Sequence, residues 1–176
     1  SRAADLARRF PAEAAAVVAA ADECRAGRFA FFGQEPVELG PGPIDWQLDP
    51  RTGFRWPAVP AARLDHRTVS ADPKWIWELN RLQHLPWLAQ AWLFTGDRAY
   101  ADAALDQLDG WLEQNPVGQG IAWRGAFEVG VRALSVTVAL QGLRDAPSMT
   151  RERYARVVAM LSKCAPLLWR QRSRFS

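Results

Sequence analysis

Three residue types that build many catalytic and metal sites are scarce in this chain. Its 176 residues include only two cysteines, two histidines and two tyrosines. Cys24 and Cys164 form no CxxC motif and have no metal-ligand spacing, and whether they pair as a disulfide stays open at this point. His66 and His84 lie far apart in the sequence pattern. The sequence therefore predicts no metal and no other cofactor.

The chain also lacks the short motifs of several enzyme classes and any long apolar run. It contains no glycine-rich phosphate loop, no GxSxG and no HExxH. No apolar run approaches the roughly 18 residues that cross a bilayer, and Ser1 follows neither an initiator Met nor a signal peptide. We expect a soluble protein without membrane insertion, whose true start lies upstream.

Charge and tryptophan content narrow the range of ligands. The 22 basic residues against 19 acidic ones are too small an excess to indicate nucleic acid, but they permit an acidic polymer. Nine tryptophans are far above ordinary usage. Indole rings suit either a thick helical core or a sugar-binding groove, and composition does not choose between the two.

Proline, glycine and capping residues divide the chain, which we expect to form a single helical domain over residues 1–176. A helix is predicted over Pro11–Arg25, with proline at its first position. Residues 29–71 are rich in proline and glycine and predict an irregular but ordered loop that holds several aromatic residues. Four further helices are expected over about 72–95, 97–114, 123–144 and from 150 onward. The predicted fold class is all-α.

The predicted helix over 72–95 has two different faces. At about 100° per residue, an apolar face separates from a face with an indole, an amide, a guanidinium and an imidazole. These are groups that bind sugar rings, hydroxyls and acidic substituents: Trp77, Asn80, Arg81 and His84. The alternative is that the polar members are solvated or pair with acids on neighbouring helices. Pro86 is expected to bend the helix directly after His84.

The predicted helix over 123–144 repeats this division. Its expected core stripe is Trp123, Phe127, Val131, Leu134 and Val138. Its polar stripe contains Arg124, Glu128, Arg132 and Ser135, in which Arg132 or Arg124 would meet substrate anions while Glu128 fixes the geometry. The alternative is an ion pair between Glu128 and Arg132, four residues apart. The predicted substrate-binding set is thus Trp77, Asn80, Arg81, His84, Trp123 and Arg132, with Glu128 as a supporting residue.

A series of linked blocks resembles the amino-terminal toroid of the heparinase II/III and alginate-lyase superfamily. The blocks are KWIWELNR (74–81), QHL (83–85), TGDRAYA (95–101), LEQNP (112–116), GIAW (120–123) and FEVGVRALS (127–135). The segment DWQLDPRTGFRWP (45–57) resembles the lead-in of the family. Two departures concern Ala122, where the family often has Asn, and Gln47, where a His often follows DW.

The resemblance implies the fold, the activity and the location of the catalytic groups. It implies an incomplete (α/α) toroid of antiparallel helix pairs, truncated here, followed in the parent protein by a β-sandwich domain. It also implies β-elimination on a uronic-acid polysaccharide such as heparan sulfate or alginate, in a bacterial protein that is periplasmic or secreted. The expected Asn-His pair and tyrosine lie beyond Ser176, since neither Tyr100 nor Tyr154 matches the family position. No catalytic residue is therefore expected in this chain, which alone should be inactive.

Two other functions fit the same sequence. One is a noncatalytic helical module that binds carbohydrate or acts as a scaffold. The other is a toroidal glycoside hydrolase, which would have to draw two carboxylates from different segments. The partners expected under the lyase hypothesis are an acidic polysaccharide and the remaining domains of the parent chain, without nucleic acid.

Overall fold

The computed structural model describes residues 2–171, so the predicted ending at 172–176 lies outside the described residues. Within them the fold is all-α, as predicted. The helices are α1 (Arg2–Arg9), α2 (Pro11–Arg25), α3 (Lys74–Asn80), α4 (Leu85–Thr95), α5 (Arg98–Gln114), α6 (Ala126–Leu143) and α7 (Arg151–Gln171). Two short 3-10 helices, η1 (Ala61–Arg63) and η2 (Ile121–Trp123), and two short strands, β1 (Arg28–Phe29) and β2 (Val37–Glu38), complete the fold.

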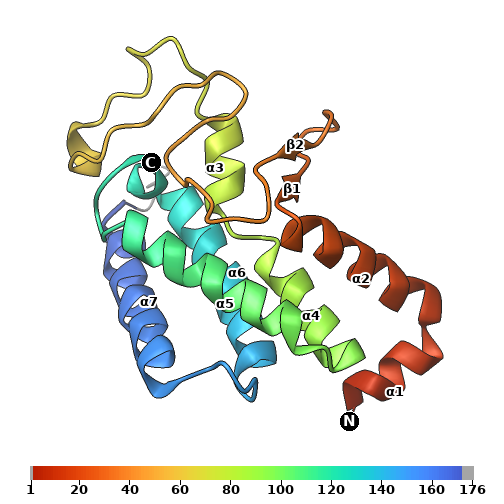
Figure 1. Cartoon of the computed structure of the whole chain (residues 1–176). Helices are drawn as coiled ribbons and strands as arrows, with labels where there is room; N and C mark the ends of the chain where they lie inside the picture. Colours follow the sequence, from red (N-terminus) through yellow and green to blue (C-terminus); the bar gives the residue numbers. More distant parts are fainter. Residues whose placement is uncertain (1, 172–176) are drawn as a thin grey trace, which may run out of the picture.

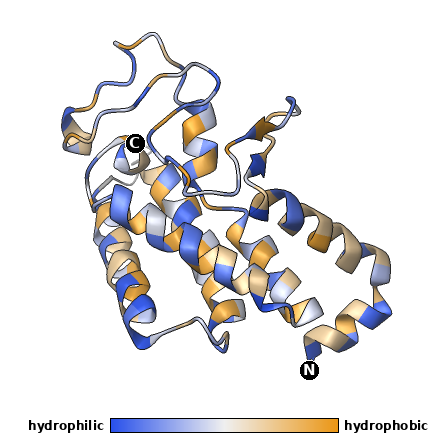
Figure 2. Cartoon of the chain, in the orientation of Figure 1, coloured by the Kyte–Doolittle hydropathy of each residue, from blue (hydrophilic) through white to orange (hydrophobic). Residues whose placement is uncertain are grey.

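Four of the helices form two rows (Figure 1). Helices α4 and α6 run parallel and side by side, since Arg132 reaches the backbone before α4 and Gly142 lies against the later turns of α4. A Cβ on Gly142 would come within 3.1 Å of the Cβ of Ala89, so glycine permits this close approach. Helices α5 and α7 form the second row and are joined by ion pairs from Arg153 to Asp106 and Asp109. Figure 2 shows hydrophobic residues along every helix, with a hydrophilic start to α7.

Local signals set several helix ends as predicted. Helix α2 begins at Pro11, and Gly96 ends α4 with a left-handed φ of 75°. The carboxylate of Asp97 accepts a hydrogen bond of 2.9 Å from the backbone of Ala99 at the start of α5. Thr150 accepts 3.1 Å from the backbone of Arg153 at the start of α7. Helix α1 is an element that the sequence did not predict.

The prediction of one helix over residues 72–95 is wrong. Helix α3 ends at Asn80, α4 begins at Leu85, and Leu82 between them has a φ of 55°. Pro86 lies in the first turn of α4, where its missing N–H group costs nothing, and so it starts a helix rather than bending one. The break separates His84 from the helical register of the residues on α3.

The loop between α2 and α3 lies partly on the surface, and it also supplies side chains to the core. Figure 1 shows it arching over one end of the helices, around α3. Trp46 and Trp56 are 0% and 1% exposed. Gln114 of α5 fixes the loop, because its amide accepts 2.9 Å from the backbone N of Trp46 and donates 2.8 Å to the carbonyl of Ile44. The loop therefore supplies two of the largest core side chains.

The predicted orientation of α6 is also wrong. Its expected core residues Phe127, Leu134 and Val138 are exposed, by 68%, 66% and 47%. The expected polar stripe is buried instead, with Glu128 and Arg132 7% and 0% exposed. By length and composition α6 could cross a membrane, but nearly half of it is buried inside the protein, as a core helix would be. The polar side of α6 faces inward because Arg132 packs against aromatic rings of the interior.

Candidate functional site

Arg132 is enclosed by aromatic rings and backbone carbonyls. Its guanidinium lies 4.6 Å from the ring centre of Trp111 and 4.8 Å from that of Trp123. It donates 3.2 Å to the carbonyl of Asn80 and 2.9 Å to that of Ala122. Burial lowers the pKa of Arg132 to about 10. The side chain joins α6 to the end of α3 and to η2, and it has no surface to offer a ligand.

Asn80 and Trp123 are equally committed to the interior. Asn80 accepts 2.8 Å from the indole N–H of Trp111 and donates 3.1 Å to the carbonyl of Trp46. The indole of Trp123 donates 3.1 Å to the carbonyl of Asn115. These two residues are 0% and 1% exposed. Their predicted contact with substrate, like that of Arg132, does not fit this structure, because additional chain can only bury them further.

Glu128 pairs with Arg81 rather than with Arg132. The Arg81 Nε and Nη2 atoms donate 2.7 Å and 3.2 Å to the two carboxylate oxygens of Glu128, and Nη1 pairs with Glu78. The hydrogen bond that Arg81 donates to Glu128 raises the pKa of Arg81. The ring of Phe127 lies 5.1 Å from the guanidinium carbon. The two carboxylates carry more negative charge than the one guanidinium neutralises. Arg81 therefore ties α3 to α6 and is not a free anion-binding group.

Trp77 is the predicted residue with the best access to a ligand. It is half-buried, and its indole donates 3.2 Å to the carbonyl of Ile121. The ring of His66 lies 5.1 Å from it, edge to face. Arg124 donates 2.7 Å through Nε to the carbonyl of Leu64, and its terminal nitrogens make no hydrogen bond within residues 2–171. Three chain segments thus meet beside one partly buried indole.

We call this surface the Trp77 patch and define it as Arg63, His66, Arg67, Trp77 and Arg124. Arg63 and Arg67 are exposed, and the arginines outnumber the single acid of the segment, Asp65. An aromatic plate bordered by cations can stack on a sugar ring and bind an acidic substituent. The contribution of His66 could not be read from the sequence, since only the crossing of the loop over η2 brings it to Trp77.

His84 lies in a different environment. It is 5% exposed, stacked on Trp46 at 6.1 Å between ring centres and edge-on to Phe29 at 5.1 Å. Burial lowers its pKa to about 4, although a hydrogen bond with Gln107 acts in the opposite direction, so the ring is neutral at physiological pH. It borders a cavity of about 500 Å³ that also includes Trp87. His84 therefore does not join Trp77 and Arg81.

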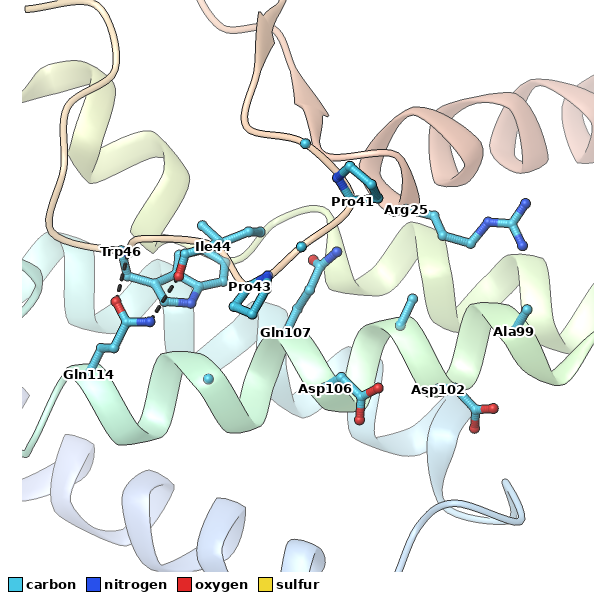
Figure 3. A pocket seen from close by; sticks show the side chains of 14 residues that line it. Arg25, Pro41, Pro43, Ile44, Trp46, Ala99, Asp102, Asp106, Gln107 and Gln114 are labelled. Carbon is cyan, nitrogen blue, oxygen red and sulfur yellow. Dashed lines mark hydrogen bonds between the residues drawn. The ribbon is translucent and has the colours of Figure 1, made fainter. Parts of the chain in front are cut away.

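A second cavity, of about 600 Å³, lies between the loop and α5 (Figure 3). Pro41 and Pro43 of the loop lie above α5 in this view and Gln107 points towards them, while Asp102 and Asp106 lie on the lower side of α5. The lining includes none of the predicted substrate-binding residues. Its two carboxylates, set against the single guanidinium of Arg25 in the lining, make it unsuited to an acidic polymer.

The placement of the thiols and of the potential metal ligands is as follows. Within the described residues no group of three His, Cys, Asp or Glu side chains could hold a metal ion. Cys24 and Cys164 are both buried and free, so they form no disulfide with each other. Burial raises the pKa of the Cys24 thiol to about 12, which makes it unreactive at neutral pH.

Comparison with solved structures identifies the class of fold. A mutant of the heparan sulfate lyase HepC from Pedobacter heparinus superposes with a TM-score of 0.72 at 20% sequence identity. The match covers 92% of this chain but only 23% of that one. The fold is thus the helical, incomplete-toroid type found in one part of that larger protein. No curated protein matches the chain in sequence.

The family model described as Heparinase II/III N-terminus matches residues 6–172. The chain therefore belongs to the heparinase II/III family, of which it represents the amino-terminal domain, and the resemblance inferred from its sequence blocks is confirmed.

Proposed function

We propose that this chain is the amino-terminal helical part of a polysaccharide lyase that cleaves uronic-acid polysaccharide by β-elimination, of the heparan sulfate or alginate type. The observation that supports this most strongly is the family match over nearly the whole chain. The likeness to a heparan sulfate lyase in fold is consistent with it. The substrate then reaches this domain as an extended acidic polymer.

The proposed reaction needs a base and an acid as well as a group that binds the carboxylate, and we assign neither the base nor the acid to residues 2–171. β-Elimination requires neutralisation of the uronate carboxylate, a base that removes the proton from C5, and an acid that protonates the leaving oxygen. His84 is enclosed, and Tyr100 is buried with its hydroxyl donating 2.9 Å to Asp22. In our proposal the base and the acid come from the remainder of the parent chain, and residues 1–176 alone are inactive.

The Trp77 patch is our proposed contact for the polymer. Its indole offers a flat apolar face, and Arg124 has terminal nitrogens ready to donate to a carboxylate or sulfate. Arg63 and Arg67 extend the positive charge along the surface. Of the residues first predicted, Trp77 stays as a direct contact, while Arg81 and Glu128 act as the ion pair that fixes α3 beside it.

The test of the reaction uses the full-length parent with heparan sulfate and with alginate. A lyase creates a product with a carbon–carbon double bond conjugated to the carboxylate, which absorbs in the ultraviolet. We expect this absorbance to grow with time. New reducing ends without it would indicate the hydrolase alternative, and binding without either product would indicate the noncatalytic module.

The test of the patch is Arg124→Gln in the same parent. Loss of one charge-assisted hydrogen bond, about 1.5–3 kcal/mol, predicts a KM raised by about tenfold or more with little change in kcat. Arg144→Gln is the matched control, because Arg144 lies at the other end of α6 and, within residues 2–171, forms an ion pair with its neighbour Asp145. Equal KM values for the two variants would remove Arg124 from the site.

A further inference from the structure

A third cavity, of about 370 Å³, lies between the connection of β1 to β2, the turn at residues 49–52 and the start of α3. Its lining includes no residue of the Trp77 patch and none of the predicted substrate-binding set. Trp75 lines it, and because Trp75 and Trp77 are two residues apart on α3, they point to different sides of the helix. The cavity is therefore a separate site, and it is large enough for one sugar ring.

Phe32 lines this cavity in a strained backbone conformation. Its φ is 59°, which a bulky residue rarely adopts, and its side chain is 57% exposed. Leu82, the other non-glycine residue of positive φ within residues 2–171, is completely buried, so packing explains its conformation. Phe32 lies outside the hydrophobic core, whereas its neighbour Phe31 packs edge-on against Trp75 at 5.1 Å. Strain that holds an aromatic ring outward is typical of a functional position.

The indole N–H group of Trp75 has no hydrogen-bond acceptor in the part of the chain that the structure describes. The side chain is nevertheless only 5% exposed. Almost all buried donors in proteins are paired, because an unpaired one costs free energy. Since Trp75 lines the cavity, an oxygen atom of a bound ligand can supply the missing acceptor.

The charges of the lining are balanced, with two acids, Asp49 and Asp72, and two bases, Arg51 and Lys74. Asp49 is 1% exposed, and its carboxylate accepts 3.0 Å from the backbone of Arg51 and 2.9 Å from the hydroxyl of Thr52. Asp72 and Lys74 form an exposed ion pair of 3.6 Å. The lining thus has donors and acceptors without an excess of positive charge. Uncharged hydroxyl groups, which both donate and accept, fit such a lining.

We propose that this cavity is a second saccharide subsite, which binds the ring and hydroxyls of one sugar unit of the polymer rather than an acidic substituent. Phe32 stacks on the C–H face of the ring. Trp75 donates to an oxygen of the sugar, and Asp72 and Lys74 accept from and donate to its hydroxyls. The inference rests on the polysaccharide substrate of the proposed function, although not on β-elimination.

The experiment is calorimetric titration of the full-length parent with heparan sulfate oligosaccharides whose uronate carboxyl groups have been reduced to alcohols. Without the carboxylate the C5 proton is not acidified, so binding is measured without turnover. Phe32→Gly should weaken binding by about five- to tenfold, because the stacking face is lost. The melting temperature should change little, since relief of the strained φ offsets the freedom that glycine adds to the unfolded chain.

The controls separate the ring from the backbone and the cavity from the remaining surface. Phe32→Tyr keeps the ring and should keep the affinity. Phe10→Gly is the matched control, because Phe10 is 48% exposed between α1 and α2, and this variant should bind like the unsubstituted parent. Phe32→Asn, which also tolerates a positive φ, provides the same readout if Phe32→Gly does not fold.

Several results would overturn the subsite. Equal affinities for Phe32→Gly and Phe10→Gly, or no binding of the reduced oligosaccharide to the unsubstituted parent, would remove the cavity from the binding surface. A loss of affinity that shrinks as salt is added would show that acidic groups are bound there instead. The unsaturated product from native polymer is a separate readout: its formation without a Phe32 effect refutes the subsite alone, and a Phe32 effect without product refutes the lyase alone.

Discussion

The two sides of α6 reverse the usual relation between polarity and burial. The inward side holds Arg132 and Glu128, which are almost completely buried, whereas the outward side holds Phe127 and Leu134, which are mostly exposed. Inside, the two terminal nitrogens of Arg132 donate to backbone carbonyls and its guanidinium lies against two indole rings, while its Nε has no hydrogen-bond partner within the described residues. Outside, the ring of Phe127 meets the guanidinium of Arg81 at 5.1 Å, whereas Leu134 and Val138 are exposed. The inward side is packed within the described residues, whereas the outward side is largely exposed.

Polarity alone therefore does not predict which residues of α6 are buried. A buried guanidinium is costly unless its donors and its charge are accommodated. Here two indole faces and two carbonyls accommodate it. An exposed leucine contributes little to the free energy of unfolding of this chain. It stabilises a contact only when another surface covers it.

The largest effect expected on the inward side is that of Arg132→Ala. The variant leaves a cavity between Trp111 and Trp123 and two carbonyls without donors, so we expect about 4 kcal/mol of destabilisation. Urea denaturation measures it. Arg132→Met, which keeps most of the volume, should lose clearly less. Equal losses for the two variants would mean that packing volume is unimportant at this position.

The next effect is a dependence of stability on pH that originates at His84. Its pKa is about 4 in the folded chain and ordinary, about 6.5, in the unfolded one. The unfolded state therefore binds the proton first, and stability is full above about pH 6.5 and falls towards pH 4, by roughly 3 kcal/mol. His84→Gln should lack this contribution. If the free energies of unfolding of His84→Gln and of the unsubstituted chain changed in parallel between pH 6.5 and pH 4, the assignment to His84 would be contradicted.

A smaller loss is expected for Asn80→Ala, about 2–3 kcal/mol, because the indole N–H of Trp111 loses its buried acceptor. Thermal unfolding monitored by tryptophan fluorescence reports both the stability and the environment of Trp111. Asn80→Asp keeps the acceptor, but it loses the donor to Trp46 and buries a charge. An unchanged melting temperature for Asn80→Ala would show that the network around α3 contributes nothing to stability.

The smallest effect is expected for Trp77→Phe, about 1 kcal/mol, because it removes one partly buried hydrogen bond of 3.2 Å to Ile121 and keeps an aromatic ring. Affinity for polymer should fall more than stability, since the stacking face shrinks. Calorimetric titration of the parent with oligosaccharide, alongside its melting curve, separates the two. A stability loss without any affinity loss would make Trp77 purely structural.

The sequence predicted those features that depend on local signals. Pro11, Gly96 and Asp97 act within one turn, so the start of α2, the end of α4 and the start of α5 were predictable. The break at Leu82 was not. A leucine with positive φ has no local signal, and its completely buried side chain shows that tertiary packing imposes the conformation.

The candidate site was predictable only in part, for the same reason. Periodicity correctly separated an apolar stripe from a polar one on α6, but it could not say which stripe faces the neighbouring helices. The pair of Arg81 with Glu128 joins residues 47 positions apart, which no spacing rule anticipates. His66 reaches Trp77 through a loop crossing. The family, by contrast, was evident from the blocks of sequence themselves.

The most direct test of the account compares Leu134→Ala with Arg132→Ala in the 176-residue chain. A conventional core helix would lose more from the leucine. We expect the leucine variant to change the free energy of unfolding by less than about 0.5 kcal/mol, as for an exposed site, and the arginine variant to lose about 4 kcal/mol. A larger loss for Leu134→Ala than for Arg132→Ala would contradict the assignment of the two sides of α6.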